Sequence, residues 1–514
     1  MAVTEGEAPL FQKLPNELAK DIFDLLPNCD IKNLRLTCCY LSHVPLRFDR
    51  IFISANLLNI EVFLAVANHE SFRHQVKEVI WDDATLTSLG SSGNDSDFDY
   101  GSDEDETDDN DYQGSSRFQQ RCREAIEDLE SRLVDKEDGN KQQTQLNNLM
   151  PSQESLQYYT QLVKEQDHVF ESGADKEAFR YALQHSRFPH LTKVTVTPAA
   201  HGFLFLPLYE TPMIRAFPYG FIYPIPRGWT CAGNIHVPQR PESWEEDKQR
   251  KWRGVQIVSQ LLADPEVAHN ISELSFDNHK LLTGINYHIF DQPNKEYDNL
   301  CRIVERPGFK KITLSVLMGW LSVQDPENWN FLKKGNIRRA LAKAHDLEEI
   351  TFQTDYPVDA TCWTGPAEDT ISLFDIFPVG KRLKHFGLSG IQVTQGELIS
   401  VLAKLPQTLK SIELSFLSVI SGTGNYAGIL ADIRDKLGWR YRPIDQRIRV
   451  RILVRLNQDA GRYICLDKEV NEYLYGDGLP PFGVNGGGNS YAMITSGTGM
   501  QYDEFDPDLI RKHR

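Results

Sequence analysis

The chain has 514 residues, of which 40% are hydrophobic, and its formal net charge is −17 at pH 7. This length allows two or more domains, or one long array of repeated units with a large core. The acidity argues against a general nucleic-acid-binding protein, because neutralising phosphates requires clustered lysines and arginines. No apolar run approaches the roughly 18 residues of a membrane span, and the first residues predict no secretory signal.

The eight cysteines form no C-x-x-C pair and lack the spacing of a disulfide framework. We interpret them as reduced thiols of an intracellular protein, which predicts a cytoplasmic or nuclear location.

Two helices are predicted near the start of the sequence, within "LPNELAKDIFDLLPNCDIKNLRLTCCYLSHV", residues 14–44. Proline at position 15 is suited to the first turn of a helix, and Asp30 can cap the second helix. Apolar residues recur at helical spacing in both segments, at Leu18, Ile22, Leu25 and Leu26 and then at Ile31, Leu34, Cys38 and Leu41. Some thirty residues cannot bury both stripes alone, so another surface must cover them.

This segment resembles an F-box in its Leu-Pro opening, its acid in the first turn, its Ile-Phe followed by Leu, and its Asp-apolar start to the second helix. It departs from the family at Tyr40 and Leu41, where a tryptophan is frequent. The resemblance implies docking on the Skp adaptor of a cullin–RING ubiquitin ligase, which is helix-in-groove recognition. The residues that would face the adaptor are Leu14, Pro15, Leu18, Ile22, Phe23, Leu26, Ile31 and Leu34. The alternative is a helical cap packed on the protein's own core.

A strand pattern recurs downstream, in "LTKVTV" from Leu191 and then from residues 271, 309, 347, 383 and 409, with a related copy from Val76. Positions one, four and six are apolar, and positions two and three are polar. The last five starts lie 38, 38, 36 and 26 residues apart, which is typical of a solenoid with variable insertions. Helix-compatible segments lie between the copies, so the units resemble irregular leucine-rich repeats without an asparagine ladder. We therefore predict an α/β chain, with an all-helical F-box followed by a solenoid of strand–helix units.

The strands of such a solenoid should expose alternate residues on a concave face, where solenoids usually bind ligands. This alternation predicts a substrate-binding surface containing Lys193, Thr195, Glu273, Asp277, Lys311, Thr313, Glu349, Gln353, His385 and Glu413. Any one of these residues could equally be a solvated surface position.

The predicted organisation has six parts along the chain. They are the F-box (10–46), a linker with a first repeat-like unit (47–90), an acidic insertion (91–116), a helical segment (117–190), the solenoid (191–470) and a Gly-rich tail (476–514). The insertion holds ten acids and no base between Asp95 and Asp111, which predicts disorder. The tail is also expected to be flexible.

Two further segments leave alternatives open. Residues 203–229 are rich in aromatics and contain five prolines, which exclude a central strand or a continuous helix. Their aromatic side chains either pack on the core or form a binding lip. Arg447, Arg449 and Arg451 should share one face of a strand, either as a charged cap on the sheet edge or as a site for acidic or phosphorylated segments.

The sequence contains no G-x-S-x-G, no H-E-x-x-H, no P-loop and no paired Cys/His spacing. We therefore predict no enzymatic activity, catalytic residue, cofactor or metal, although a hydrolase or transferase stays an alternative. The favoured hypothesis is a substrate-recognition subunit of a Skp–cullin–F-box ligase, in a layout that resembles fungal F-box proteins. A scaffold acting with the Skp adaptor outside a ligase is the other binding hypothesis.

Overall fold

The computed structural model describes residues 14–26, 28–88, 110–134, 140–229, 242–245, 249–319, 330–355, 372–378, 380–420, 422–456, 460–483 and 494–513. This part of the chain is mixed α/β, with one large parallel sheet and 17 α-helices, and its sheets do not close into a barrel. The acidic tract between Asp95 and Asp109 lies outside the described residues, whereas α4 already begins at Asn110.

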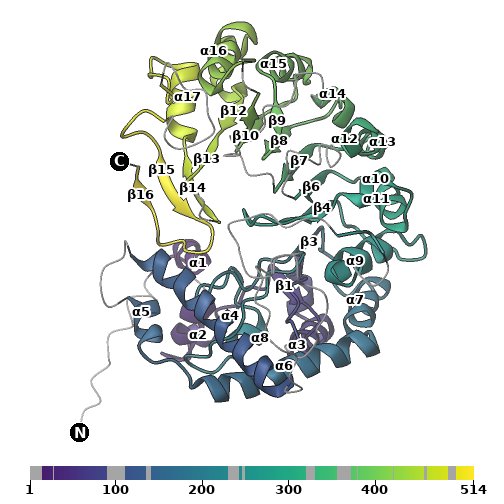
Figure 1. Cartoon of the computed structure of the whole chain (residues 1–514), viewed down its shortest axis with the longest axis vertical. Coiled ribbons are helices and arrows are strands. Elements are labelled where there is room, and N and C mark those ends of the chain that lie inside the picture. Colours follow the sequence, from purple (N-terminus) through teal and green to yellow (C-terminus); the bar gives the residue numbers. More distant parts are fainter. Residues whose placement is uncertain are drawn as a thin grey trace, which may run out of the picture.

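The large sheet follows chain order. Its path runs β1-β2-β3-β4-β6-β7-β8-β10-β12, every neighbouring pair is parallel, and β5 (Ile285–Asn286) pairs with β6 off this path. The strands of the path are β1 (Arg50–Ile53), β2 (Glu78–Asp82), β3 (Lys193–Thr197), β4 (Glu273–Phe276), β6 (Lys311–Leu317), β7 (Glu349–Thr354), β8 (His385–Ser389), β10 (Ser411–Ser415) and β12 (Arg449–Arg451). Figure 1 shows these strands as an arc with helices along its outer side.

The recurring apolar positions explain why these segments are strands. The fourth and sixth positions of each copy point into the layer between sheet and helices, and in β6 these are Ile312 and Leu314, at 2% and 1% exposure. The first position, such as Phe309, is buried in the same core. Alternate residues therefore face the inner side of the arc, as the period of a strand requires.

Helices return the chain from one strand to the next. The helices of these connections are α3 (Leu57–Asn68), α7 (Ala174–Gln184), α9 (Arg253–Ala263), α10 (His288–Asp291), α11 (Lys295–Glu305), α12 (Asn330–Lys333), α13 (Asn336–Ala342), α14 (Leu373–Ile376), α15 (Gln395–Lys404) and α16 (Tyr426–Lys436). Several carry side-chain N-caps, for example Thr394 on α15 and Asn294 on α11. The short strands β9 (Gln392–Val393) and β11 (Ser418–Val419), which follow β8 and β10 in the chain, pair with each other in parallel.

A second core lies beside the first strands. It packs α4 (Asn110–Leu133) and α6 (Ser152–Ser172), with α5 (Lys141–Leu146) and α8 (Pro212–Arg215) nearby, against the aromatic segment 203–229. Phe203, Phe221 and Tyr223 are buried there. Of the two alternatives for this segment, core packing is therefore correct for most of its aromatic side chains, while Tyr219 is exposed.

Residues 500–503 and 511–512, within the predicted flexible tail (476–514), are strands, which corrects that part of the prediction, whereas residues 484–493 lie outside the described residues. The strands β13 (Leu453–Arg455), β14 (Arg462–Cys465), β15 (Met500–Asp503) and β16 (Arg511–Lys512) form an antiparallel sheet, and α17 (Asp467–Tyr475) packs against the end of the arc. The tail prediction rested on glycine content, whereas the burial of residues 500–503 alternates as in a strand of a sheet. This sheet spans the opening of the arc toward α4 (Figure 1).

Candidate functional site

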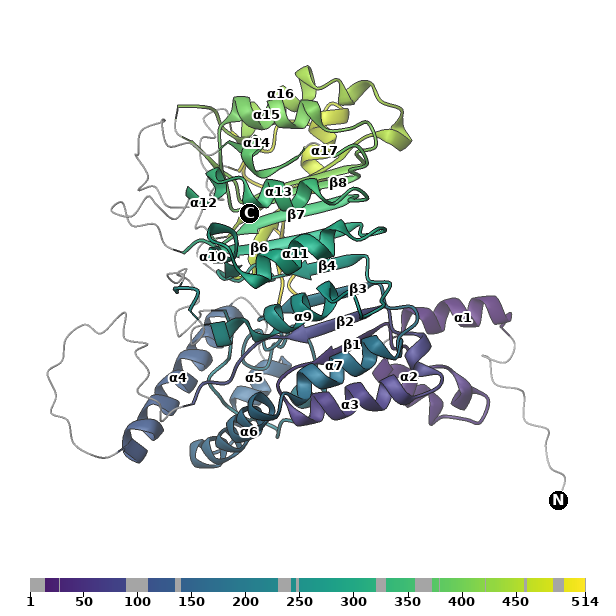
Figure 2. The same cartoon turned by 90° about the vertical axis from the view of Figure 1, so that its right-hand side faces the viewer.

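The N-terminal helices form a small unit with a core of its own. They are α1 (Asn16–Leu25) and α2 (Asn28–Arg35), followed by a 3-10 turn at Leu41–His43. The core of this unit consists of buried Ile31, Leu41 and Val44, with partly buried Phe23, Leu26, Leu34, Cys38 and Leu46 around them. In Figure 2, α1 extends away from the stacked strands.

The turn between α1 and α2 is tied to the chain that leaves the unit. The Arg47 guanidinium donates hydrogen bonds to the carbonyls of Asp24 and Leu26. The Asn28 amide donates to the Arg47 carbonyl at 2.7 Å and accepts from the Arg47 N–H at 2.9 Å. Phe48 then contacts the ring of Phe72, with centroids 4.2 Å apart. These contacts hold the unit against the first strand–helix pair.

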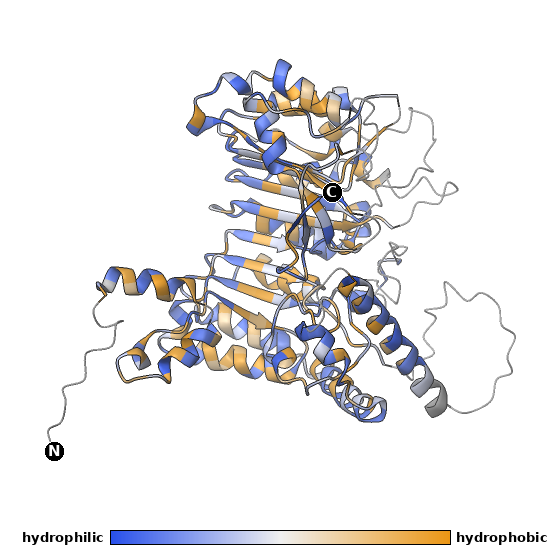
Figure 3. Cartoon of the chain, turned by 90° about the vertical axis from the view of Figure 1, so that its left-hand side faces the viewer, coloured by the Kyte–Doolittle hydropathy of each residue, from blue (hydrophilic) through white to orange (hydrophobic). Residues whose placement is uncertain are grey.

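One apolar stripe of α1 is uncovered. Leu18, Ile22 and Leu25 recur at i, i+4 and i+7, and their exposed fractions are 51%, 36% and 84%. The neighbouring stripe, which consists of Ala19, Phe23 and Leu26, faces inward: Ala19 is buried, and Phe23 and Leu26 are partly buried against the small core. Covering one exposed Leu or Ile completely would contribute about 1.5–3 kcal/mol. Figure 3 shows apolar bands along the projecting helix.

The predicted adaptor-facing residues fall into three groups. Leu18, Ile22 and Pro15 are exposed, and Leu14 is partly exposed. Phe23, Leu26 and Leu34 are partly buried: they pack against the small core and keep part of their surface exposed. Ile31 needs correction, because its side chain is 1% exposed and is covered by its own chain.

Two exposed leucines were missing from that set. They are Leu25, at 84% exposure, and Leu36, at 86%. The helical spacing from Leu18 already indicated Leu25. Leu36 follows the end of α2, so the period of a helix does not predict its direction.

The inner face of the arc carries a row of mostly charged residues. The first residues of its nine strands stand in register, from β1 to β12. In order they are Arg50, Glu78, Lys193, Glu273, Lys311, Glu349, His385, Ser411 and Arg449. We call this set the charge ladder; its sign alternates over the first six positions.

The members of the charge ladder pair with their neighbours. Glu78 accepts from Lys193 at 2.8 Å, and Lys311 lies 3.6 Å from Glu273 and 3.3 Å from Glu349. The His385 Nδ1 lies 2.9 Å from the Ser411 hydroxyl. All of these side chains keep some exposure, so this edge of the sheet is an accessible, laterally paired polar surface. Of the predicted concave-face residues, the ladder contains Lys193, Glu273, Lys311, Glu349 and His385.

The other half of the inner face is covered by the chain itself. Thr195 and Gln353, both predicted surface residues, are buried at 3% and 6% exposure, which corrects that prediction. The Thr195 hydroxyl donates to Glu78 at 2.7 Å, and the Gln353 amide donates to Asn278 at 3.1 Å. Thr313, Glu413 and Asp277 keep partial exposure.

The covering comes from the aromatic segment and the C-terminal sheet. Tyr209 lies 5.7 Å from the Phe52 ring and its hydroxyl lies 3.2 Å from His279 Nε2. The other His279 nitrogen lies 3.1 Å from the Glu504 carboxylate. Burial lowers the pKa of His279, but Asp277 and Glu504 outweigh it, so this pKa lies above its usual value. The sequence repeat could not indicate this covering, because neither segment belongs to the repeat.

Asp82, Asp83 and Asp355 are buried carboxyl groups with raised pKa values, a property that catalytic groups often have. Burial raises the pKa of Asp82, Asp83 and Asp355 to about 7. Asp83 accepts from the Trp229 indole at 2.8 Å and from the Gly254 N–H at 2.6 Å. Asp355 similarly accepts from two backbone N–H groups after β6. These two carboxyls hold loops at the ends of strands.

Asp82 is the exception among the three. One of its oxygens has no hydrogen-bond partner and lies 3.7 Å from His201 Nε2. The other His201 nitrogen lies 3.0 Å from the Tyr223 hydroxyl. Asp82 and His201 are 2% and 1% exposed, so a substrate could not reach this pair in the observed conformation.

Comparisons with known proteins identify no relative: no family model matches the chain, and no curated protein matches it. Among the described residues, no group of three or more His, Cys, Asp or Glu side chains could hold a metal ion. Within the same residues, every helix is too short or too polar to cross a membrane.

Proposed function

We propose that this protein is a substrate-recognition subunit of a Skp–cullin–F-box ubiquitin ligase. In this proposal the α1–α2 unit is an F-box that docks on the Skp adaptor. The strand–helix units are irregular leucine-rich repeats that form a solenoid and hold a protein substrate. The chemistry of ubiquitin transfer belongs to other subunits, so the chain itself needs no catalytic residue.

One observation carries the proposal: the stripe of Leu18, Ile22 and Leu25 stays exposed although the unit has a small core. A helix that served only as a cap would turn its apolar stripe inward, because leaving it in water forgoes several kcal/mol. An exposed stripe on a projecting helix is typical of helix-in-groove binding. Because the sequence of the same segment resembles an F-box, we infer that the groove belongs to a Skp-type adaptor.

The charge ladder is the surface that best suits a substrate. Its residues are accessible, stand on rigid strands and present alternating charge, which favours specificity over non-specific attraction. It lies at the amino ends of the strands, and the α1–α2 unit leads directly into the amino end of β1. A substrate held on the ladder would therefore lie toward the docking unit.

The docking prediction is tested by binding of the purified chain to a recombinant Skp-type adaptor. Leu18→Asp combined with Ile22→Asp should weaken binding by more than about 100-fold, because two apolar anchors are lost and two charges must be desolvated. The melting temperature should stay within a few degrees of the parent protein, since both side chains are already exposed.

The matched control is Ile444→Asp combined with Leu479→Asp, at residues that are 81% and 84% exposed elsewhere on the molecule. This control should bind the adaptor normally. Normal adaptor binding by the folded Leu18/Ile22 variant would refute the docking surface. Adding a cullin separates the two binding hypotheses: retention of both partners favours the ligase, and retention of the adaptor alone favours the scaffold.

A further inference from the structure

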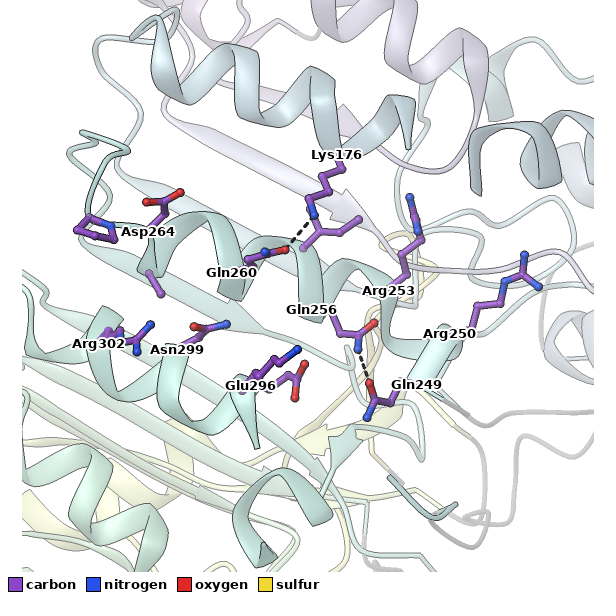
Figure 4. Close-up of a pocket in the computed structure, with 14 residues that line it drawn as sticks. Lys176, Gln249, Arg250, Arg253, Gln256, Gln260, Asp264, Glu296, Asn299 and Arg302 are labelled. Carbon is purple, nitrogen blue, oxygen red and sulfur yellow. Dashed lines mark hydrogen bonds between the residues drawn. The ribbon is translucent and has the colours of Figure 1, made fainter. Parts of the chain in front are cut away.

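A polar groove lies on the outer, helical side of the arc, remote from the charge ladder. It is formed by α7, α9 and α11 together with the 3-10 turn Gln249–Trp252, and its volume is about 930 Å³. Figure 4 shows side chains from these elements converging on it. Ile257, Ala263 and Pro265 supply its apolar part.

Five cations line this groove, against two carboxylates. Two of the cations build its walls. The Arg253 guanidinium donates to both oxygens of the buried Asp175, at 2.9 and 2.7 Å. The Lys176 ammonium donates to Gln260 at 3.0 Å, which joins α7 to α9. The wall between these two helices is therefore fixed by hydrogen bonds.

The other three cations, Arg250, Lys295 and Arg302, are exposed. Within the described residues none of them has an ion pair with a carboxylate; Arg250 lies 4.9 Å from the Phe170 ring. The two carboxylates are already engaged: Glu296 accepts from the Trp244 indole at 3.2 Å, and Asp264 accepts from the Glu266 N–H at 2.9 Å. The groove thus offers uncompensated positive charge on a chain whose net charge is −17.

Amide side chains lie between these cations. Gln249 and Gln256 are hydrogen-bonded to each other at 2.7 Å, and Asn299 projects from α11. Amides can donate to and accept from a peptide backbone, while Lys and Arg pair with carboxylates. This combination suits an extended chain with acidic side chains.

We propose that this groove binds an acidic peptide segment of another protein. Nucleic acid fits less well, because no aromatic residue lines the groove to stack on a base. The negative charge of the whole chain would also repel a long polyanion. The inference is independent of adaptor docking, which uses α1.

The test uses a fluorescein-labelled peptide of eight glutamates and fluorescence anisotropy of the full-length protein at low salt. Lys295→Glu combined with Arg302→Glu should weaken binding about tenfold or more, because two attractive pairs become repulsive. The matched control is Lys381→Glu combined with Lys410→Glu, which changes the net charge equally at two exposed lysines outside the groove. This control should bind within about twofold of the parent protein.

Equal weakening in both variants would overturn the site, because it would mean that only net charge matters. Equally tight binding of an oligouridine with the same charge would overturn the peptide assignment. Deletion of residues 95–111 should leave the affinity nearly unchanged; a large gain would mean that the chain's own acidic tract occupies the groove. The Leu18/Ile22 variant should bind the peptide normally, so failure of this proposal and failure of adaptor docking are distinguishable.

Discussion

A single residue, Asp82, links burial in this protein to a pH dependence of stability. Burial raises the pKa of its carboxyl group from 3.8 to about 7 in the folded protein. The folded state therefore binds this proton more tightly than the unfolded state, so the contribution of Asp82 to stability falls as the pH rises from about 4 to about 7. One of its oxygens accepts a hydrogen bond from the Ala84 N–H at 3.1 Å, which favours the ionised form, but the other oxygen has no partner and burial outweighs this bond.

Asp82→Asn should remove this loss, because asparagine keeps the oxygen that accepts from Ala84 but cannot ionise. The free energy of unfolding of the variant minus that of the parent protein should therefore be larger at pH 8 than at pH 5, by about 1 kcal/mol or more. Chemical denaturation at the two pH values measures this change. Asp83→Asn is the contrast, since both of its oxygens accept hydrogen bonds and one donor would be left without an acceptor at either pH. A pH slope that is unchanged in Asp82→Asn would contradict the prediction.

Sequence patterns did not predict which apolar side chains of the two N-terminal helices are buried. The apolar spacing of α1 was visible in the sequence, but two overlapping stripes share it, from Leu18 and from Ala19. Which stripe turns inward depends on contacts with Leu41 and Val44, beyond the second helix. Helical periodicity fixes the spacing of a stripe but not its rotation. The same limit applies to α2, where the burial of Ile31 was not predicted.

At the scale of elements, the repeated strands were predictable because each copy carries its own signal. Three apolar positions per strand lie in one core, and six copies stand in register, so each supports the assignment of the others. β1 lacks that pattern and was not predicted. The C-terminal strands are two to four residues long and pair in antiparallel fashion outside the repeat. Their formation depends on distant partners, which a local pattern does not record.

Helix α9 approaches the sheet closely at a glycine. A Cβ atom built on Gly254 would lie 2.4 Å from the Trp81 ring and 2.7 Å from an Asp83 oxygen. Gly254→Ala should therefore push α9 away from β2 and lower the free energy of unfolding by about 1–3 kcal/mol, the usual cost of overpacking. Thermal and denaturant unfolding of the full chain would measure it.

The comparison for this prediction is Gly396→Ala near the start of α15, where a Cβ would meet nothing within 4 Å. Alanine should be neutral there, or stabilise by up to about 1 kcal/mol, because glycine is a poor helix former. If the free energy of unfolding falls in Gly254→Ala and rises in Gly396→Ala, packing against Trp81 matters at position 254. A harmless Gly254→Ala would show that α9 can shift without cost.

For the whole molecule, the arc is closed by contacts between distant parts of the sequence. The Arg132 guanidinium, on α4, donates to the Asp503 carboxylate on β15 and to the Ala460 carbonyl. Arg462 reinforces the junction by donating to Asp503 at 3.0 Å and to the Arg132 carbonyl at 2.8 Å. The ring centroids of Phe203 and Phe505 are 5.1 Å apart, and the Arg132 guanidinium carbon lies 3.4 Å from the Phe203 ring centroid. This junction joins the two ends of the arc and keeps the carboxyl-side half of the inner face covered.

Arg132→Met tests whether this junction holds the arc closed. Methionine preserves much of the apolar volume but removes the donor to the Ala460 carbonyl and a cationic donor to Asp503, which keeps its hydrogen bonds from Arg462 and the Phe505 N–H. The loss should cost about 2–4 kcal/mol. Hydrogen exchange should speed up first in β14 and β15, while β6 and β7, in the middle of the large sheet, stay protected. Arg451→Met is the control: its ion pair with Asp467, at 3.1 Å, is half exposed and should contribute less than about 1 kcal/mol. Equal acceleration in β6 and β14 would mean that the arc and its closure unfold as one unit, which would contradict the prediction.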